Sequence, residues 1–176
     1  MRKLVAAALA LAVVALLAGC TVYVNGPGQH GVIPVGGIAS ASAVPTAIAT
    51  SVSCPTGTRT LSKSNVRYVI TGSCSEVRVT GSSVGITASH IDKLSIKGSF
   101  DSVVAGSIGT LTITGDTDTV TSPGPTKVRI DGYYNVVKVS GPIASANVTG
   151  DNNTVTSSSK IPNIHESGAG NQIGPG

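Results

Sequence analysis

Histidine, serine and threonine side chains are the first candidates for catalysis, because a hydroxyl nucleophile needs a base beside it. The three histidines are His30, His90 and His165. The zinc-protease pattern H-E-x-x-H does not occur, and we find no His–Asp pair placed to activate a serine or threonine. We therefore expect His90 and His165 to be separate surface or corner residues. The sequence predicts no catalytic residue and no cofactor.

Paired carboxylates are the second candidates, because glycosidases and lyases cleave polysaccharides with two acidic groups. The residues to weigh are Asp101, Asp116, Asp118 and Asp131. Asp101 and Asp118 occupy the same position in successive copies of a repeat, so they are expected to be neighbours. Other copies have Asn at that position, which favours a structural role for both. The pair could also hold Ca²⁺, but the G-G-x-G-x-D repeat of calcium-binding solenoids is missing, so no metal is predicted.

Threonine and tyrosine raise a third kind of chemistry, the binding of ice or carbohydrate by a flat outer face. Charged residues such as Lys138 and Arg129 interrupt the array, which favours ordinary solvated strand faces. Tyr133-Tyr134 is the aromatic cluster of the repeat and is interpreted as a corner filler, with a contact patch for a glycan or partner as the alternative. The outward threonines are Thr112, Thr114, Thr119, Thr121, Thr154 and Thr156.

The amino-terminal residues carry the clearest signal. Met1-Arg2-Lys3 is a short positive start, and Leu4 to Leu17 is an apolar run of 14 residues. This order is typical of a secretory signal peptide, and the run is too short for a transmembrane helix, which needs about 20 apolar residues.

Cys20 indicates the subtype of this signal. The segment Leu17-Ala18-Gly19-Cys20 matches the lipobox of bacterial lipoproteins in all four positions. The resemblance implies that Cys20 receives a diacylglyceryl group and becomes the first residue after cleavage. We therefore expect residues 1–19 to be a lipoprotein signal peptide. Two or three acyl chains on Cys20 would hold the protein at the extracytoplasmic face of the cell membrane.

Cys54 and Cys74 remain as a pair once Cys20 is acylated. Disulfides persist outside the cytoplasm, so these residues are the predicted disulfide partners. A bond across this loop would contribute about 3 kcal/mol to stability. A metal site is not predicted, because no nearby His or Cys completes a set of four ligands.

Composition excludes further classes of protein. Of the 176 residues, 11% are charged and 3% are aromatic, with no Trp. A nucleic-acid binder needs a dense basic surface and stacking aromatics, so no nucleic-acid partner is expected. The formal net charge of +4 falls to +2 when Arg2 and Lys3 of the signal are removed. The remaining chain is rich in Val, Ile, Thr, Ser and Gly, which favours strands and tight turns over a helical bundle.

Two regions follow the signal. Residues 20–53 hold the lipidated cysteine and a stretch rich in Gly, Ala, Pro and Ser, which predicts a flexible linker. Residues 54–176 repeat the unit φ-x-φ-x-G-x-x-[N/D]-x-φ, where φ is apolar. The repeated glycines are spaced by 17, 17, 17, 18 and 18 residues, at Gly81, Gly98, Gly115, Gly132, Gly150 and Gly168. Three residues after a glycine stand Asp101, Asp118, Asn135, Asn153 and Asn171, while the first copy has Val84.

The repeat predicts a fold. Alternation of apolar residues turns one face of a short strand inward. Three short strands per unit, separated by corners, form one triangular coil, and stacked coils bury a continuous core. Glycine is expected to supply a left-handed backbone at the corner, and Asn or Asp to stack from coil to coil. We predict an all-β protein, a β-solenoid of about six coils. A β-sandwich is the alternative, although it would not need a constant period.

The repeat also resembles a known family. Tandem V-x-V-x-G-x-x-N-x-V units after a lipobox and a cysteine pair are similar to an uncharacterised domain family of actinobacterial secreted proteins and lipoproteins. The resemblance covers about residues 54–175, with Asp101, Asp118 and Val84 as departures from the usual Asn. It implies the fold and the location and carries no assigned activity.

These observations lead to two functional hypotheses. The first is a non-enzymatic, membrane-anchored envelope lipoprotein whose β-solenoid is a scaffold for contact with an envelope protein or glycan. The alternative is a carbohydrate-active enzyme of the cell envelope, a glycosidase or lyase built on a β-helix.

Overall fold

The computed structural model describes residues 49–54 and 57–176 of the chain. The predicted signal peptide, the lipidation site Cys20 and nearly all of the predicted linker lie outside these residues. Among the described residues, no helix is long and apolar enough to cross a membrane.

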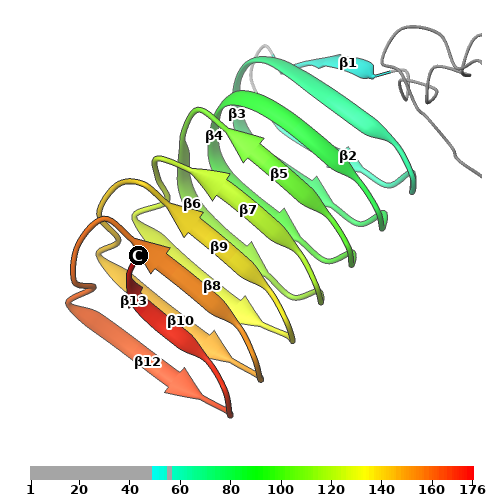
Figure 1. Ribbon diagram of the computed structural model, residues 1–176. Coiled ribbons are helices and arrows are strands. Elements are labelled where there is room, and N and C mark those ends of the chain that lie inside the picture. Colours follow the sequence, from blue (N-terminus) through cyan, green and yellow to red (C-terminus); the bar gives the residue numbers. More distant parts are fainter. Residues whose placement is uncertain (1–48, 55–56) are drawn as a thin grey trace, which may run out of the picture. The chain divides into compact units, whose positions relative to one another are not determined.

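The described part of the chain is a β-solenoid of about seven turns, built from parallel strands and without helix. Successive coils stack on one another in two rows of strands (Figure 1). Two long strands, β3 (Arg67–Val79) and β4 (Gly85–Ile96), pass a corner of the coil and belong to both rows. The predicted solenoid is therefore confirmed, and the β-sandwich alternative is excluded because the pairing is parallel throughout.

Each row continues strand by strand along the solenoid. The first row runs through β1 (Thr50–Ser53), β3, β4, β5 (Ser102–Ala105), β7 (Thr119–Ser122), β9 (Val136–Val139), β11 (Thr154–Ser157) and β13 (Gln172–Pro175). The second row runs through β2 (Thr58–Leu61), β3, β4, β6 (Ile108–Ile113), β8 (Lys127–Asp131), β10 (Ser145–Thr149) and β12 (Asn163–Ser167).

The core consists of apolar columns, one residue from each coil. Alternation along the second-row strands places two residues of each strand inside. Their side chains are at most 3% exposed from Val77 and Val79 through to Ala146 and Val148. The columns pair in register as Val77, Leu94, Leu111, Val128, Ala146 and as Val79, Ile96, Ile113, Ile130, Val148. The prediction that alternation turns one face of these strands inward is thus confirmed.

Three details differ from the sequence prediction. The last four residues of the predicted linker, 50–53, form β1, because the free edge of β3 recruits a segment whose own apolar pattern is too short to detect. A coil that the repeat did not reveal precedes the first repeated glycine, since Lys63 and Val66 replace its glycine and Asn. The third side of the coil is part of the long strand in β3 and β4, whereas in the coils from β7 onward it is a turn and not a third strand.

The last described coil departs from the apolar pattern. In register, Glu166 of β12 takes the position that Val148 occupies in the coil before it, and Pro175 pairs with Ser157 at the edge of β13. A charged residue at a register position that is part of the core in other coils, and an edge proline, both disfavour the addition of another strand. These two residues therefore disfavour the stacking of a further coil on this end of the described solenoid.

Candidate functional site

The repeated glycines lie where neighbouring coils approach most closely. A Cβ atom built on Gly115 would stand 1.6 Å from the carbonyl oxygen of Gly98, and one on Gly98 would stand 1.8 Å from that of Gly81. The positive φ angle falls two residues later, at Phe100 (61°), Thr117 (61°) and Tyr134 (57°). Among the repeated glycines, only Gly150 and Gly168 have a positive φ. The expectation that these glycines generally supply a left-handed backbone is therefore wrong, because most of them provide space for the neighbouring coil.

The Asn and Asp residues that follow form a ladder along the solenoid. In each coil the side-chain Oδ1 accepts a hydrogen bond from the backbone N–H at the same position of the preceding coil. The donors and acceptors are Val84 to Asp101 (2.8 Å), Asp101 to Asp118 (2.8 Å), Asp118 to Asn135 (2.9 Å), Asn135 to Asn153 (3.0 Å) and Asn153 to Asn171 (2.9 Å). The ladder satisfies backbone groups that the turn would otherwise leave unpaired inside the protein.

The amide group of each Asn completes a second bond in this ladder. Nδ2 donates to the carbonyl oxygen of the repeated glycine one coil earlier, from Asn135 to Gly115 at 3.0 Å and from Asn153 to Gly132 at 2.8 Å. Asp101 and Asp118 have no amide, and their buried Oδ2 atoms have no hydrogen-bond partner. Burial raises the pKa of both carboxyls, against the hydrogen bond that each receives from the backbone, and brings that of Asp118 to about 7.

The same geometry bears on the carboxylate pair considered for glycoside cleavage. Asp101 and Asp118 lie in adjacent coils as expected, but their side chains are only 1% and 0% exposed. A polysaccharide in solvent cannot reach carboxyl groups that are enclosed between stacked turns. Asp116 and Asp131, the other two candidates, are exposed on the turn and on β8.

The structure brings together a serine, a histidine and an aspartate that the sequence analysis left apart. His90 Nδ1 is hydrogen-bonded to Ser107 Oγ in the next coil, and His90 Nε2 lies 2.8 Å from Asp92 Oδ1. This is the order of nucleophile, base and orienting carboxylate in a catalytic triad. The imidazole and its carboxylate partner are open to water, with the side chains of His90 and Asp92 41% and 60% exposed.

A signal for this cluster exists in the sequence. Ser107 follows His90 by one repeat length of 17 residues, so the two stack in adjacent coils. Asp92 follows His90 by two residues on β4, which places both on the outer face. The expectation that no His–Asp pair stands beside a serine is therefore wrong. His165 is separate, exposed on β12 opposite Asn147.

Residues 81–85 read Gly-Ser-Ser-Val-Gly and fit the G-x-S-x-G pattern of hydrolase nucleophiles. Ser83 has a φ of 58°, as the nucleophile turn requires. The segment connects β3 to β4, however, whereas the hydrolase turn leads from a strand into a helix. The same φ recurs at this position in the other coils, so the match follows from the structural repeat.

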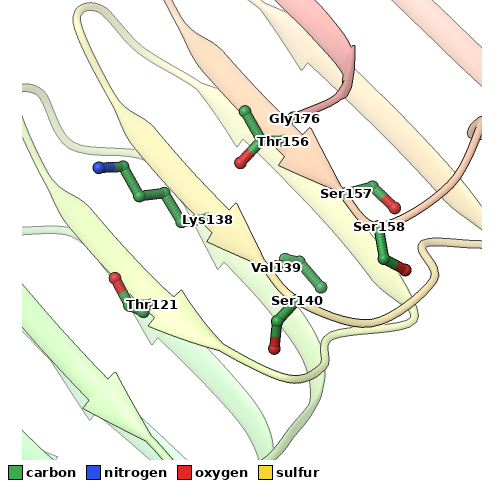
Figure 2. Close-up of a pocket in the computed structure, with 8 residues that line it drawn as sticks. All are labelled: Thr121, Lys138, Val139, Ser140, Thr156, Ser157, Ser158 and Gly176. Carbon is green, nitrogen blue, oxygen red and sulfur yellow. The ribbon is translucent and has the colours of Figure 1, made fainter.

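The outer face of the first row carries a shallow hollow near the carboxyl ends of β7, β9 and β11. Figure 2 shows Lys138 between Thr121 and Thr156, with Ser157 at the end of β11 and Ser158 directly after it. In register, Lys138 stands directly between these threonines. The lysine breaks the outward threonine column, as expected, so this face does not form a continuous hydroxyl array.

Exposed aromatic side chains gather on the turns. Phe100 is 66% exposed, Tyr133 49% and Tyr134 61%, whereas Tyr68 is buried in the core. Phe100 and Tyr134 hold the same turn position in coils separated by one intervening coil, with Thr117 between them. The interpretation of Tyr133 and Tyr134 as corner fillers is wrong, because their rings project into solvent.

A disulfide joins Cys54 to Cys74, whose Cα atoms are 5.1 Å apart. Both residues are buried, at 3% and 0% exposure. The bond ties the first coil to the second at a corner where Cys54 N–H also donates to the carbonyl oxygen of Thr71. The predicted pairing is thus present in the structure.

The fold and its side chains define the chain as a β-solenoid with a buried Asn/Asp ladder and exposed turns. Comparison with family models, with curated proteins and with solved structures found no match to this chain.

Proposed function

We propose that the protein is a non-enzymatic lipoprotein of the cell envelope, anchored in the membrane through Cys20, whose β-solenoid is a rigid scaffold for contact with an envelope glycan or protein. The observation that carries the scaffold role is the buried ladder. Its carboxyl and amide groups, the main polar groups of the repeat, form hydrogen bonds between adjacent coils. The surface left for function consists of strand faces and turns.

The location rests on two independent supports. The segment from Leu17 to Cys20 fits a lipobox after an apolar run of signal-peptide length. The disulfide between Cys54 and Cys74 is compatible with an exported domain, because such bonds persist outside the cytoplasm.

The anchor is tested by replacing Cys20 with serine, which removes the thiol that would carry the lipid. We expect the wild-type protein to incorporate labelled fatty acid and to sediment with membranes, and the Cys20→Ser variant to do neither. The double variant Cys54→Ser with Cys74→Ser is the control, because it removes both disulfide cysteines of the folded domain and should leave lipid labelling intact. Equal labelling or equal membrane association of wild type and Cys20→Ser would contradict the proposal.

A second candidate function, hydrolysis of an ester or amide, is favoured by the Ser107–His90–Asp92 cluster. His90 Nδ1 is placed to take the proton of the Ser107 hydroxyl as Oγ attacks a carbonyl carbon, and Asp92 would hold the opposite ring nitrogen. Against this function, the exposure of His90 and Asp92 lets water compete for the hydrogen bond between them, which weakens the hold of the carboxylate on the imidazole.

A fluorophosphonate probe separates the two functions, because it labels activated serines covalently. We expect no labelling of Ser107, since an exposed His–Asp pair activates a hydroxyl weakly. The Ser73→Ala variant is the control for Ser107→Ala, because Ser73 flanks His90 from the preceding coil. Labelling that Ser107→Ala abolishes and Ser73→Ala retains would establish a serine hydrolase and refute the non-enzymatic proposal.

A further inference from the structure

The exposed aromatic residues lie on neighbouring turns of the solenoid, with one threonine between them. We call this surface the aromatic ridge and define it as Phe100, Thr117, Tyr133 and Tyr134. The turns that carry it are bonded directly to one another. Phe100 N–H donates to the carbonyl oxygen of Asp116 at 3.1 Å, and Thr117 N–H to that of Tyr133 at 2.8 Å. Because stacked coils are about 4.8 Å apart, the Cα atoms of Phe100 and Tyr134 are separated by about 10 Å along the solenoid.

The backbone of the ridge disfavours the residues that it holds. Phe100, Thr117 and Tyr134 have φ angles of 61°, 61° and 57°, a region in which bulky and β-branched residues are strained. Other coils place smaller residues here, at Asn65, Ser83, Asn152 and Gly170, and Asn and Gly are the residue types that best suit this conformation. Strain of this kind is typical of sites that a function maintains. Two large, exposed rings at strained positions therefore indicate a role outside the fold.

The ridge is also rigid. Beneath it runs the ladder through Asp101, Asp118 and Asn135, each directly following a ridge residue in sequence. Tyr134 N–H donates to the carbonyl oxygen of Asp151 at 3.1 Å, and Tyr133 N–H to Asp116 Oδ1 at 2.7 Å. Rings on a fixed backbone lose little freedom when they meet a ligand, which favours binding.

The polar groups around the rings limit the chemistry of the ligand. Residues 99–101, 116–118, 133–135 and 151–153 of the ridge turns contain carboxylates, hydroxyls and amides, and the single Lys or Arg of these turns is Lys97, at the start of the first one. Asp116 and Asp151 each use one carboxyl oxygen for a backbone N–H. Neither carboxylate takes part in an ion pair among the described residues, and such carboxylates repel polyanions and accept hydrogen bonds from hydroxyl groups. The surface therefore fits a ligand that is uncharged, rich in hydroxyls and apolar on one face.

A pyranose ring has these properties, because its C–H groups carry partial positive charge and stack on the negative face of an aromatic ring. In an extended, equatorially linked chain, alternate sugars lie about as far apart as residues of alternate coils. We propose that the aromatic ridge binds an extended, uncharged glycan chain, with sugar rings stacked on Phe100 and Tyr134. This inference rests on the proposed scaffold function and specifies its partner.

The experiment is a calorimetric titration of the detergent-solubilised, full-length protein. The probe is a β-1,4-linked hexamer of N-acetylglucosamine, with an α-1,4-linked glucose hexamer, whose chain is coiled, for comparison. The test variant is Phe100→Asn with Tyr134→Asn, since Asn suits the left-handed backbone that it would occupy. Ser83→Asn is the matched control, made at the same turn position without the loss of a ring.

We expect the wild type to bind the β-1,4-linked hexamer and the double variant to bind it about tenfold more weakly or not at all. The Ser83→Asn control should bind as the wild type does. Circular dichroism of the double variant should be unchanged and its thermal midpoint equal or higher, so lost binding would not reflect lost folding.

Three results would overturn the proposal: no binding of the β-1,4-linked hexamer by the wild type, equal binding by the double variant, or equal binding of the two hexamers. None of them would overturn the scaffold function, which is tested separately by lipid labelling and by crosslinking on intact cells. Crosslinks from the ridge to a protein, without glycan binding, would replace the glycan proposal by a protein partner.

Discussion

Replacing Gly115 with alanine is expected to destabilise the protein by about 4 kcal/mol or more. The added Cβ would lie 1.6 Å from the carbonyl oxygen of Gly98 and 2.8 Å from Asp118 Oδ2. Both atoms belong to the packed turn, so neither can move without shifting one coil against the next. The same shift would stretch the bond from Asn135 Nδ2 to the Gly115 carbonyl oxygen. Because φ of Gly115 is not positive, the effect would come from packing and not from backbone preference.

Two other glycines separate this effect from a general intolerance of alanine. A Cβ on Gly85 would meet the Arg67 side chain at 3.6 Å, an ordinary contact, and one on Gly174 would meet nothing within 4 Å. We expect Gly85→Ala and Gly174→Ala to change the free energy of unfolding by less than about 0.5 kcal/mol. Chemical denaturation followed by circular dichroism measures all three variants. A Gly115→Ala protein as stable as Gly174→Ala would show that the coils are not packed as closely as the structure has them.

The repeat made most of the fold predictable. Stacked coils must present the same residue type at the same position, so Leu94 and Leu111 could be placed in one buried column from their spacing alone. The ladder was predictable for the same reason, because Asn135 and Asn153 recur in phase with the glycines. In each case, residues that are one repeat apart in the sequence are neighbours in adjacent coils, so the spacing predicts the contact directly.

Features that break the period were not predictable in this way. The first coil has Lys63 in place of the repeated glycine, so the repeat motif does not predict this coil. Strand β1 forms only because it pairs with the edge of β3. The position of the left-handed residue was misplaced because Gly is the usual choice, whereas here Phe100 and Tyr134 adopt that conformation. Ser107 and His90 are also separated by one repeat length, but both lie outside the repeat motif, so the motif alone does not predict their contact.

At Asp118 the ladder has a carboxyl group in the place that Asn135 fills with an amide. We expect Asp118→Asn to stabilise the protein by about 2–4 kcal/mol at pH 8. Asn can keep Oδ1 as the acceptor for Asp101 N–H, and its Nδ2 can donate to the Gly98 carbonyl oxygen, as Asn135 does to Gly115. The substitution would thus satisfy a buried oxygen that now has no partner and would remove a charge from the interior.

The gain should depend on pH in a defined direction. In the folded protein, burial holds the pKa of Asp118 at about 7, well above its ordinary value of 3.8. Below about pH 4 the carboxyl is protonated in both states and carries no penalty. Between pH 4 and pH 7 the unfolded chain releases the proton and the folded protein retains it, so stability falls as pH rises. Above pH 7 both states are ionised and the loss is complete.

Asp101 acts in the same direction, because burial raises its pKa as well. Glu76 acts in the opposite direction at the acid edge of this window: a hydrogen bond from Arg78 lowers its pKa, so its contribution is lost as the pH falls below its ordinary value of 4.5. The wild-type protein should therefore be less stable at pH 8 than at pH 5, whereas Asp118→Asn should show a clearly smaller difference.

The measurement is the free energy of unfolding of each protein across pH 4 to pH 8. Asp131→Asn is the matched control, because it removes the same charge from an exposed side chain that lies 3.9 Å from Arg129. At pH 4, wild type and Asp118→Asn should be similar, since a protonated carboxyl can donate to the glycine carbonyl as an amide does. A wild-type slope that persists in Asp118→Asn would place the titrating group elsewhere. A less stable Asp118→Asn at pH 8 would mean that the carboxylate, and not the amide, is what this turn is built to hold.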